Sequence, residues 1–258
     1  MFSPEGPTLL ELTVQAMSST ERGYDLLAPK FDSTPFRTPD RVLEAFAATV
    51  EPLGPFVRGL DVCTGTGAGA GVLRRLCTER VVGVDFSAGM LAEARGAYGD
   101  GDGDGDSYPG SDADTAAAGR PPTHWVRADT LALPFAPAFD LAVSFGAFGH
   151  FLPAERPALF GQVFRSLRPG GYFAFPVPAP PPVGSRGYWA LWGFDTVMRV
   201  RNALWRPPFV MYYRTFRLPD VVADLERTGF TVATAALAEL GRRPDGSPRA
   251  RAVLARRP

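Results

Sequence analysis

A glycine-rich stretch early in the chain constrains the fold more than any other feature. Residues 59–71 read Gly-Leu-Asp-Val-Cys-Thr-Gly-Thr-Gly-Ala-Gly-Ala-Gly, which predicts a short apolar strand, a tight turn and the start of a helix. Glycine suits such a turn because it lets the backbone approach a ligand closely and adopt torsion angles that a side chain disfavours. The stretch therefore predicts a ligand-binding strand–turn–helix unit.

Two classes of ligand compete for this turn. Residues 65–70 satisfy the spacing G-x-G-x-x-G/A, with which a dinucleotide places its pyrophosphate on a helix N-terminus. S-adenosylmethionine has no phosphate, and its pattern is an acidic residue followed by three alternate glycines. Asp61 supplies that acid, Cys63 stands in the first glycine position, and Gly65 and Gly67 fill the other two. The turn alone leaves both ligands open.

The overall composition excludes several classes of protein. A length of 258 residues suits one large α/β domain, or a domain with an added cap. The formal net charge is zero, so the totals predict no binding to nucleic acid or to an anionic membrane, although a local basic patch stays open. The only cysteines, Cys63 and Cys77, fall inside one strand–turn–helix unit, which favours a reducing, cytoplasmic location over a disulfide framework.

Three further features are expected to be absent. The first seven residues lack the basic and apolar regions of a secretory signal. No run of 18 or more apolar residues occurs, so no membrane span is expected. The two histidines and two cysteines lie too far apart in sequence to predict a structural zinc site, and no metal is expected.

The order of the predicted elements indicates the fold class. Strand and helix patterns alternate along the chain, which predicts an α/β fold with a doubly wound, mostly parallel sheet and helices on both faces. The five predicted parallel strands are 60–62, 80–85, 124–129, 139–145 and 172–175. Residues 230–240 and 249–255 are predicted to form an antiparallel C-terminal hairpin across the Asp-Gly turn at 243–247.

Residues 99–120 interrupt this pattern. Alternating Asp and Gly residues make the segment one of low complexity, and it is predicted to be a disordered insertion. The aspartates partly imitate a calcium loop, but Ser111 occupies the twelfth position, where a bidentate glutamate belongs. A calcium site is therefore the weaker alternative.

Five motifs, in their order and spacing, resemble the class I S-adenosylmethionine-dependent methyltransferases that act on small molecules. The motifs are residues 60–67, 84–91, 127–135, 139–151 and 167–172. The resemblance implies a Rossmann-like, seven-stranded sheet with the antiparallel hairpin and a helical, aromatic cap. It also implies that Asp85 accepts the ribose hydroxyls and that Asp129 faces the adenine amino group. Cys63, in place of the usual glycine, is the main departure from the family pattern.

The resemblance predicts S-adenosyl-L-methionine as the cofactor. The residues expected to contact it are Tyr24, Asp61, Cys63, Gly65, Gly67, Asp85, Phe86, Met90, Ala128, Asp129, Thr130 and Ser144. An NAD(P)-dependent oxidoreductase explains only part of this set, because it gives Asp61, Asp129 and the hairpin no role. A non-catalytic S-adenosylmethionine-binding protein is the third hypothesis.

The predicted reaction is transfer of a methyl group to a small, aromatic or hydrophobic metabolite on O, N or C. Most of the acceleration of such a reaction comes from aligning the reactants and excluding water, so no particular catalytic residue is required. A hydroxyl acceptor would benefit from a base, and His150 is the candidate, with simple packing as the alternative role. The residues expected to contact the acceptor are Phe36, Arg37, Phe148, Trp189, Trp192, Tyr212 and Tyr213.

The predicted organisation has two parts. Residues 1–50 form an N-terminal helical lid, and residues 51–258 form the methyltransferase domain with a substrate cap over about 177–216. Nine aromatic residues between 188 and 216 suit a flat or apolar acceptor, a cap core or a dimer interface. The expected partner is the small-molecule methyl acceptor, and the protein is expected to be a monomer or homodimer.

Overall fold

The computed structural model describes residues 6–99 and 120–258. The strands are β1 (Phe56–Val62), β2 (Cys77–Asp85), β3 (Thr123–Arg127), β4 (Phe139–Val143), β5 (Leu167–Pro178), β6 (Thr231–Ala236) and β7 (Ala250–Arg256). The α-helices are α1 (Leu9–Met17), α2 (Thr20–Leu27), α3 (Asp40–Val50), α4 (Ala68–Leu76), α5 (Ala88–Tyr98), α6 (Arg156–Ser166), α7 (Arg186–Leu204) and α8 (Leu218–Thr228). The predicted disorder and the calcium alternative fall on residues 100–119, outside the described residues.

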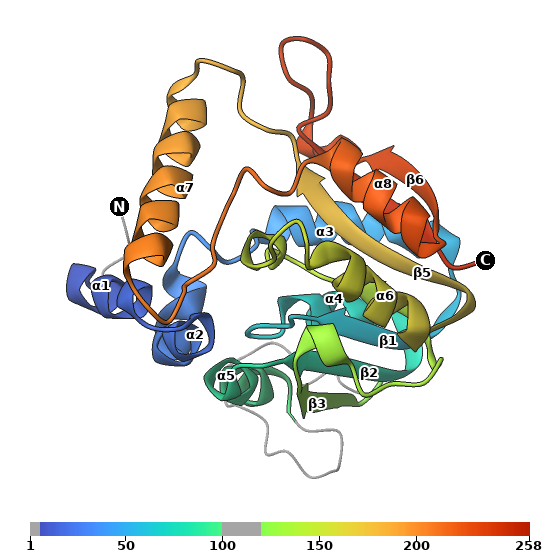
Figure 1. Ribbon diagram of the computed structural model, residues 1–258. Coiled ribbons are helices and arrows are strands. Elements are labelled where there is room, and N and C mark those ends of the chain that lie inside the picture. Colours follow the sequence, from blue (N-terminus) through green and yellow to red (C-terminus); the bar gives the residue numbers. More distant parts are fainter. Residues whose placement is uncertain (1–5, 100–119) are drawn as a thin grey trace.

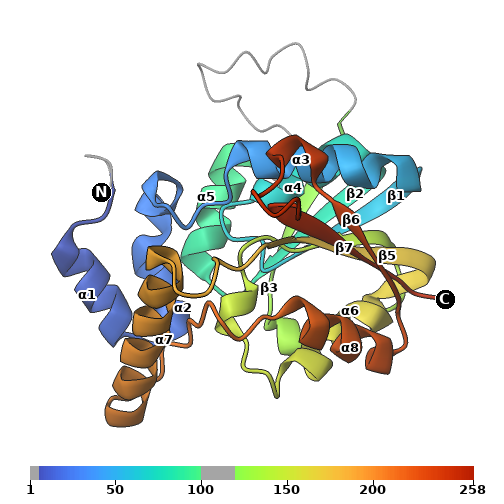
Figure 2. The same cartoon turned by 90° about the horizontal axis from the view of Figure 1, so that it is seen from above.

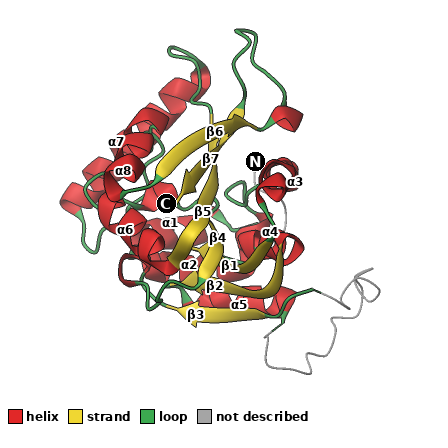
Figure 3. Cartoon of the chain, turned by 90° about the vertical axis from the view of Figure 1, so that its right-hand side faces the viewer, coloured by secondary structure: helices red, strands yellow, loops and turns green. Residues whose placement is uncertain are grey.

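The strands form one seven-stranded sheet in the order β3-β2-β1-β4-β5-β7-β6 (Figure 1). Strands β3, β2, β1, β4 and β5 are parallel neighbours, whereas β7 runs antiparallel to both β5 and β6. Helices cover both faces of the sheet (Figure 3). The predicted doubly wound sheet and its antiparallel terminal hairpin are confirmed.

Alternating side chains along the strands build two cores, one on each face of the sheet. Leu60 and Val62 of β1 join the core that α6 and α8 cover. Leu141 and Val143 of β4 join the opposite core, which α3, α4 and α5 cover. Because both faces are buried, the central strands are apolar throughout rather than alternating apolar with polar residues.

Three strands are longer than the sequence pattern predicts. Strand β1 begins at Phe56 rather than Leu60. Strand β2 begins at Cys77 rather than Arg80, because its exposed polar residues pair through their backbones with the start of β1. Strand β5 begins at Leu167, so the predicted turn at 167–171 is part of the strand. Leu167 pairs with Phe139, and an irregularity in the register precedes the next pair. Backbone pairing of this kind leaves no hydrophobic pattern to detect.

Two groups of elements lie beyond the carboxyl ends of the parallel strands. The first is the lid, here α1, α2 and the 3-10 helix η1 (Ala28–Ser33), and the second is the cap, here residues 186–217 with helix α7. Figures 1 and 2 show α1, α2 and α7 gathered at one end of the molecule. Helix α3 packs instead on α4 and β5. The division of the chain at residue 50 stays a prediction.

A third, smaller core joins the lid to the cap. Met198, Phe209, Met211 and Tyr212 of the cap are buried together, and Tyr24 of α2 packs against them. Two hydrogen bonds reinforce the joint: the Val210 N–H donates to the Thr20 hydroxyl, and Arg201 donates to the Ser18 carbonyl. These contacts couple the position of the lid to the position of the cap.

Candidate functional site

The glycine-rich turn links β1 to α4 and has an unusual backbone. Cys63, Gly65 and Gly67 have φ angles of 56°, 55° and 94°. Cys63 is the one non-glycine residue with positive φ among residues 6–99 and 120–258. Cys63 occupies the first glycine position of the sequence pattern. Glycine suits this position because a residue with a Cβ costs about 1–2 kcal/mol in the left-handed region of backbone torsion angles.

Asp61 lies at the end of β1 and organises the turn. Its carboxylate accepts a hydrogen bond of 2.5 Å from the Thr64 hydroxyl and another from the Ala70 N–H at the start of α4. Burial raises the pKa of Asp61 to about 7, although both hydrogen bonds oppose that rise. The side chain therefore has a structural role in ordering the turn.

Asp85 ends β2 beside the turn. One carboxylate oxygen accepts from the Gly65 N–H and the other from the Ser87 N–H, each at 2.9 Å. Burial raises the pKa of Asp85, and these N–H groups lower it. Each carboxylate oxygen can accept a second hydrogen bond. Phe86 is half-buried beside Asp85, and Met90 is buried in the first turn of α5.

The ends of β3 and β4 complete the edge of the sheet. The Ala128 N–H donates to the Asp85 carbonyl at 3.1 Å, which holds the end of β3 against the end of β2. Asp129 is exposed and caps a short helix by accepting from the Leu131 N–H. Thr130 is buried, and its hydroxyl accepts from the Cys63 thiol at 3.8 Å.

Two observations indicate room for a ligand at this edge. A Cβ built on Gly65 would meet no atom within 4 Å among the described residues. The hydroxyl of Ser144, which follows β4, is buried and has no hydrogen-bond partner in the described part of the chain. Ser144 follows directly on β4, the neighbour of β1, and between these two strands the strand order reverses, which is where open α/β sheets bind ligands. A polar ligand would fit the donors and acceptors that remain.

The lid docks on this edge through carboxylates that the sequence reasoning missed. Asp25 accepts hydrogen bonds from the Ser87 hydroxyl at 2.6 Å and from the Gly89 N–H at 2.9 Å, both at the start of α5. Asp32 accepts from the Thr66 hydroxyl at 2.7 Å. The available signal was indirect: short acidic side chains favour helix N-termini, but sequence alone does not say which helix.

Tyr24 and His150 form a partly buried pair between the lid and the 3-10 helix Phe148–His150 that follows β4. The ring nitrogen Nδ1 of His150 lies 2.6 Å from the Val210 carbonyl oxygen, which can only accept, so Nδ1 carries the proton. Nε2 therefore accepts from the Tyr24 hydroxyl, at 2.7 Å. Burial lowers the pKa of His150 and raises that of Tyr24, so both groups stay neutral.

The residues predicted to contact an acceptor are divided among three places. Phe148 is buried in the sheet core and stacks on Phe216, with ring centroids 4.3 Å apart. Phe36 packs against the third core, and Arg37 pairs with Asp40 at 2.7 Å. The structure thus brings only part of this set toward the strand ends.

The aromatic residues predicted in the cap also differ in exposure. Tyr212 is buried, and its hydroxyl accepts from the Asn202 amide at 2.9 Å. Tyr213 is partly exposed and packs on Phe194. Trp189 and Trp192 lie on the outer surface of α7.

The dinucleotide alternative fits this site poorly. A dinucleotide-binding sheet has the order 3-2-1-4-5-6, whereas this sheet ends in an inserted antiparallel strand. Asp61 and Asp85 also place two buried carboxyl groups beside the turn, where a pyrophosphate would have to lie. Asp61 also accepts the hydrogen bond of the Ala70 N–H, so this donor at the N-terminus of α4 is not free to bind a pyrophosphate.

Comparisons with known proteins agree with the geometry. Residues 60–175 match the family model described as a methyltransferase domain. The chain is 36% identical over 133 residues to the demethylmenaquinone methyltransferase of Thermus thermophilus, covering 50% of this chain and 51% of that protein. It is 34% identical over 114 residues to the 2-phytyl-1,4-naphtoquinone methyltransferase of Thermosynechococcus vestitus, covering 43% and 42%. The chain thus spans about half the length of the curated relatives it matches.

The fold also matches solved structures. Magnesium protoporphyrin IX methyltransferase from Synechocystis, solved with bound SAH, superposes with a TM-score of 0.53 at 16% identity. The superposition covers 84% of this chain and 82% of that one, so the likeness extends beyond the matched domain. At this identity it is a likeness of fold.

Proposed function

We propose that this protein transfers a methyl group from S-adenosylmethionine to a small apolar acceptor, since residues 60–175 match a methyltransferase domain. One observation carries the proposal. The Asp85 carboxylate is fixed at the end of β2, 2.9 Å from the Gly65 N–H, where Gly65 itself borders open space. A carboxylate in this position suits the free ribose hydroxyls of a nucleoside, and the buried Asp61 carboxyl group beside the same turn disfavours a phosphate there.

The strand ends supply the contacts for such a cofactor. Asp85 would accept the ribose hydroxyls through its remaining lone pairs, and charge strengthens those hydrogen bonds. Phe86 and Met90 would offer apolar surface to the adenine ring, and Asp129 a carboxylate to its amino group. Ser144 would find in the cofactor the partner that its buried hydroxyl lacks. Bound S-adenosylmethionine would supply a methyl group on a sulfonium centre, already activated for transfer.

The Tyr24–His150 pair supports a role in proton transfer. Since Nε2 of His150 already accepts from Tyr24, His150 would act through that hydroxyl rather than directly on an acceptor. A proton leaving an acceptor hydroxyl would pass to the Tyr24 oxygen while the Tyr24 proton passes to Nε2. The bond from Nδ1 to Val210 would hold the ring in position and favour the resulting cation.

An aromatic acceptor agrees with the cap and with the relatives. The two curated relatives are named as a demethylmenaquinone methyltransferase and a 2-phytyl-1,4-naphtoquinone methyltransferase. The third core places Phe209 and Tyr212 near Tyr24, so flat apolar surface borders the proposed proton path. An apolar ring compound carrying a hydroxyl group is the acceptor class that we propose.

Calorimetry tests the proposal directly. The wild-type protein should bind S-adenosylmethionine and its demethylated product, and NADH should give no heat. Asp85→Asn keeps the side-chain volume but removes the charge, and it should weaken binding by about 10-fold or more. Asp245→Asn, in the exposed hairpin loop, is the matched control and should bind as the wild type does. A folded wild-type protein that binds neither methyl-carrying nor demethylated cofactor would refute the proposal.

A further inference from the structure

Helix α7 exposes an apolar stripe that the described part of the chain leaves uncovered. Trp189, Trp192, Val197, Val200 and Leu204 are exposed by 46–81% of their surface. At 100° per residue these five side chains fall within an arc of about 140° on one side of the helix. The opposite side carries Asp195 and Met198, the buried residues of this helix. The helix is therefore anchored by one face and apolar on the other.

Basic side chains flank this stripe. The cap contains six arginines and one aspartate, although the whole chain has a formal net charge of zero. The aspartate, Asp195, is buried and accepts from the N–H groups of Tyr213 and Arg214, so it neutralises no surface arginine. Among the described residues no ion pair involves the cap arginines, which are Arg186, Arg199, Arg201, Arg206, Arg214 and Arg217. The cap surface is thus both apolar and cationic.

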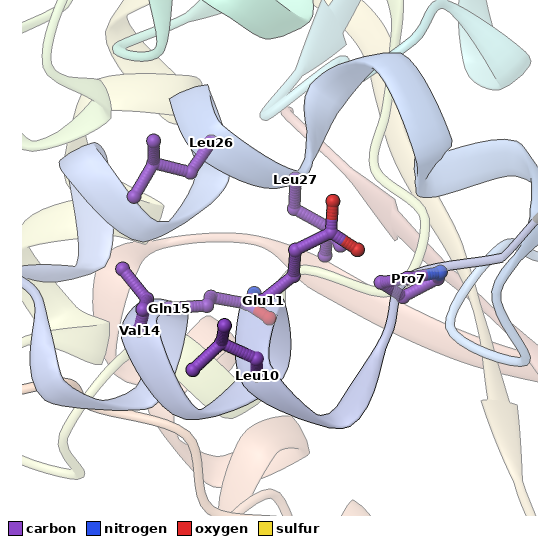
Figure 4. A pocket seen from close by; sticks show the side chains of 7 residues that line it. All are labelled: Pro7, Leu10, Glu11, Val14, Gln15, Leu26 and Leu27. Carbon is purple, nitrogen blue, oxygen red and sulfur yellow. The ribbon is translucent and has the colours of Figure 1, made fainter.

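The lid adds apolar surface at the same end of the molecule. Leu10 and Val14 of α1 and Leu26 of α2 are exposed and line an open groove between the two helices (Figure 4). Helices α1, α2 and α7 lie side by side in both overall views (Figures 1 and 2). The lid therefore adds exposed apolar side chains at the end of the molecule that carries the cap, in a groove that Glu11 and Gln15 also line.

We propose that the α7 face docks on the surface of an anionic phospholipid bilayer, with the helix lying in the plane of the interface. The exposed tryptophans and the arginines beside them offer the two contacts that hold a helix on an anionic bilayer surface, burial of apolar side chains and attraction to the anionic headgroups. Among the described helices none is long and apolar enough to cross a membrane, so the contact is with one surface. Charge decides against a second copy as the occupant, because the same cationic face would then meet itself.

Docking at this face would bring the proposed site to an apolar compound dissolved in the bilayer. The cap that touches the membrane also holds Val210 and Tyr212, which contact His150 and its neighbour Gly149. This consequence rests on the proposed function, whereas the docking itself does not.

Co-sedimentation with vesicles tests the docking without any cofactor. The wild-type protein should bind vesicles of phosphatidylglycerol and phosphatidylcholine, and bind pure phosphatidylcholine much less. Three of the four tryptophans lie in the cap and are about half exposed, so their fluorescence should shift to shorter wavelength on binding. Added salt should weaken the binding, because it screens the arginines.

Two double variants separate the contributions. Arg186→Gln with Arg206→Gln should lower the partition coefficient about 30-fold, since each arginine near an anionic surface contributes about fivefold. Val200→Gln with Leu204→Gln should lower it about tenfold or more. Arg41→Gln on α3 and Val57→Thr at the start of β1 are the matched controls, and thermal melts verify that each variant folds.

Three results would overturn the docking proposal. The first is absence of wild-type binding to anionic vesicles. The second is equal binding by both double variants and the wild type. The third is a dimer in light scattering that Leu204→Gln dissociates while vesicle binding is absent. Calorimetric binding of S-adenosylmethionine is measured separately, so its failure and the failure of docking can be told apart.

Discussion

Replacing Gly69 by alanine should destabilise the protein through its contact with Asp61. Gly69 is the second residue of α4, and a Cβ there would lie 2.6 Å from the Asp61 Cγ. Asp61 is buried and held by Thr64 and Ala70, so it has no other position to adopt. Overpacking of this kind costs about 1–3 kcal/mol, and the better helix propensity of alanine returns less than about 1 kcal/mol. We expect a net loss of about 1–2 kcal/mol.

Thermal unfolding followed by circular dichroism measures this loss. For a domain of this size, the midpoint should fall by about 2–8 °C. Gly96→Ala is the matched control, since its Cβ would meet nothing within 4 Å and it lies inside α5. That variant should be more stable than the wild type by about 0.5–1 kcal/mol. An unchanged or higher midpoint for Gly69→Ala, beside a raised one for Gly96→Ala, would show that Asp61 is free to move.

Three other substitutions probe the site and its support. The pKa of Asp61 is raised to about 7 by burial, so the folded state retains the proton and stability should fall as the pH rises from about 4 to 7. Asp61→Asn should remove that slope, about 1.4 kcal/mol for each unit of pKa difference, in melts measured across this range. Tyr24→Phe should lower kcat about 100-fold with little change in calorimetric cofactor affinity, and an unchanged kcat would limit His150 to packing. Arg156 pairs with buried Asp224 at 2.7 Å, so Arg156→Met should cost about 3 kcal/mol, read from a denaturant midpoint, and a cost below about 1 kcal/mol would contradict the reasoning.

The central sheet could be predicted because its signals are local. An apolar run ending in an acid marks the ends of β1 and β2, and Ser87 after the second acid caps α5 as expected. The Asp-Gly turn at 243–247 also forms, closed by a 2.8 Å hydrogen bond from the Arg243 N–H to the Ser247 carbonyl. In each case neighbouring residues determine the conformation, so the sequence pattern suffices.

The lid and the cap could not be predicted in the same way, because distant pairs define them. Nothing near Asp25 in sequence indicates that it caps α5, more than sixty residues later. The aromatic block at 188–216 predicted an acceptor site, but α7 turns Trp189 and Trp192 outward while Tyr212 packs inward. The composition of this block predicted that aromatic surface would be present. Which side of α7 faces solvent is decided by the packing of Met198 and Asp195 on its other side.

The docking of the lid has a kinetic consequence. Asp25 attaches it to the start of α5 and Asp32 attaches it to Thr66 in the glycine-rich turn before α4, and both points border the same edge of the sheet. A ligand bound beneath the lid can exchange only after these hydrogen bonds break, so the frequency of lid opening sets an upper limit on the rate of its release. Turnover under saturating conditions would then be governed by opening rather than by methyl transfer. A substitution such as Asp25→Ala would accelerate release, at the expense of protecting the site from water.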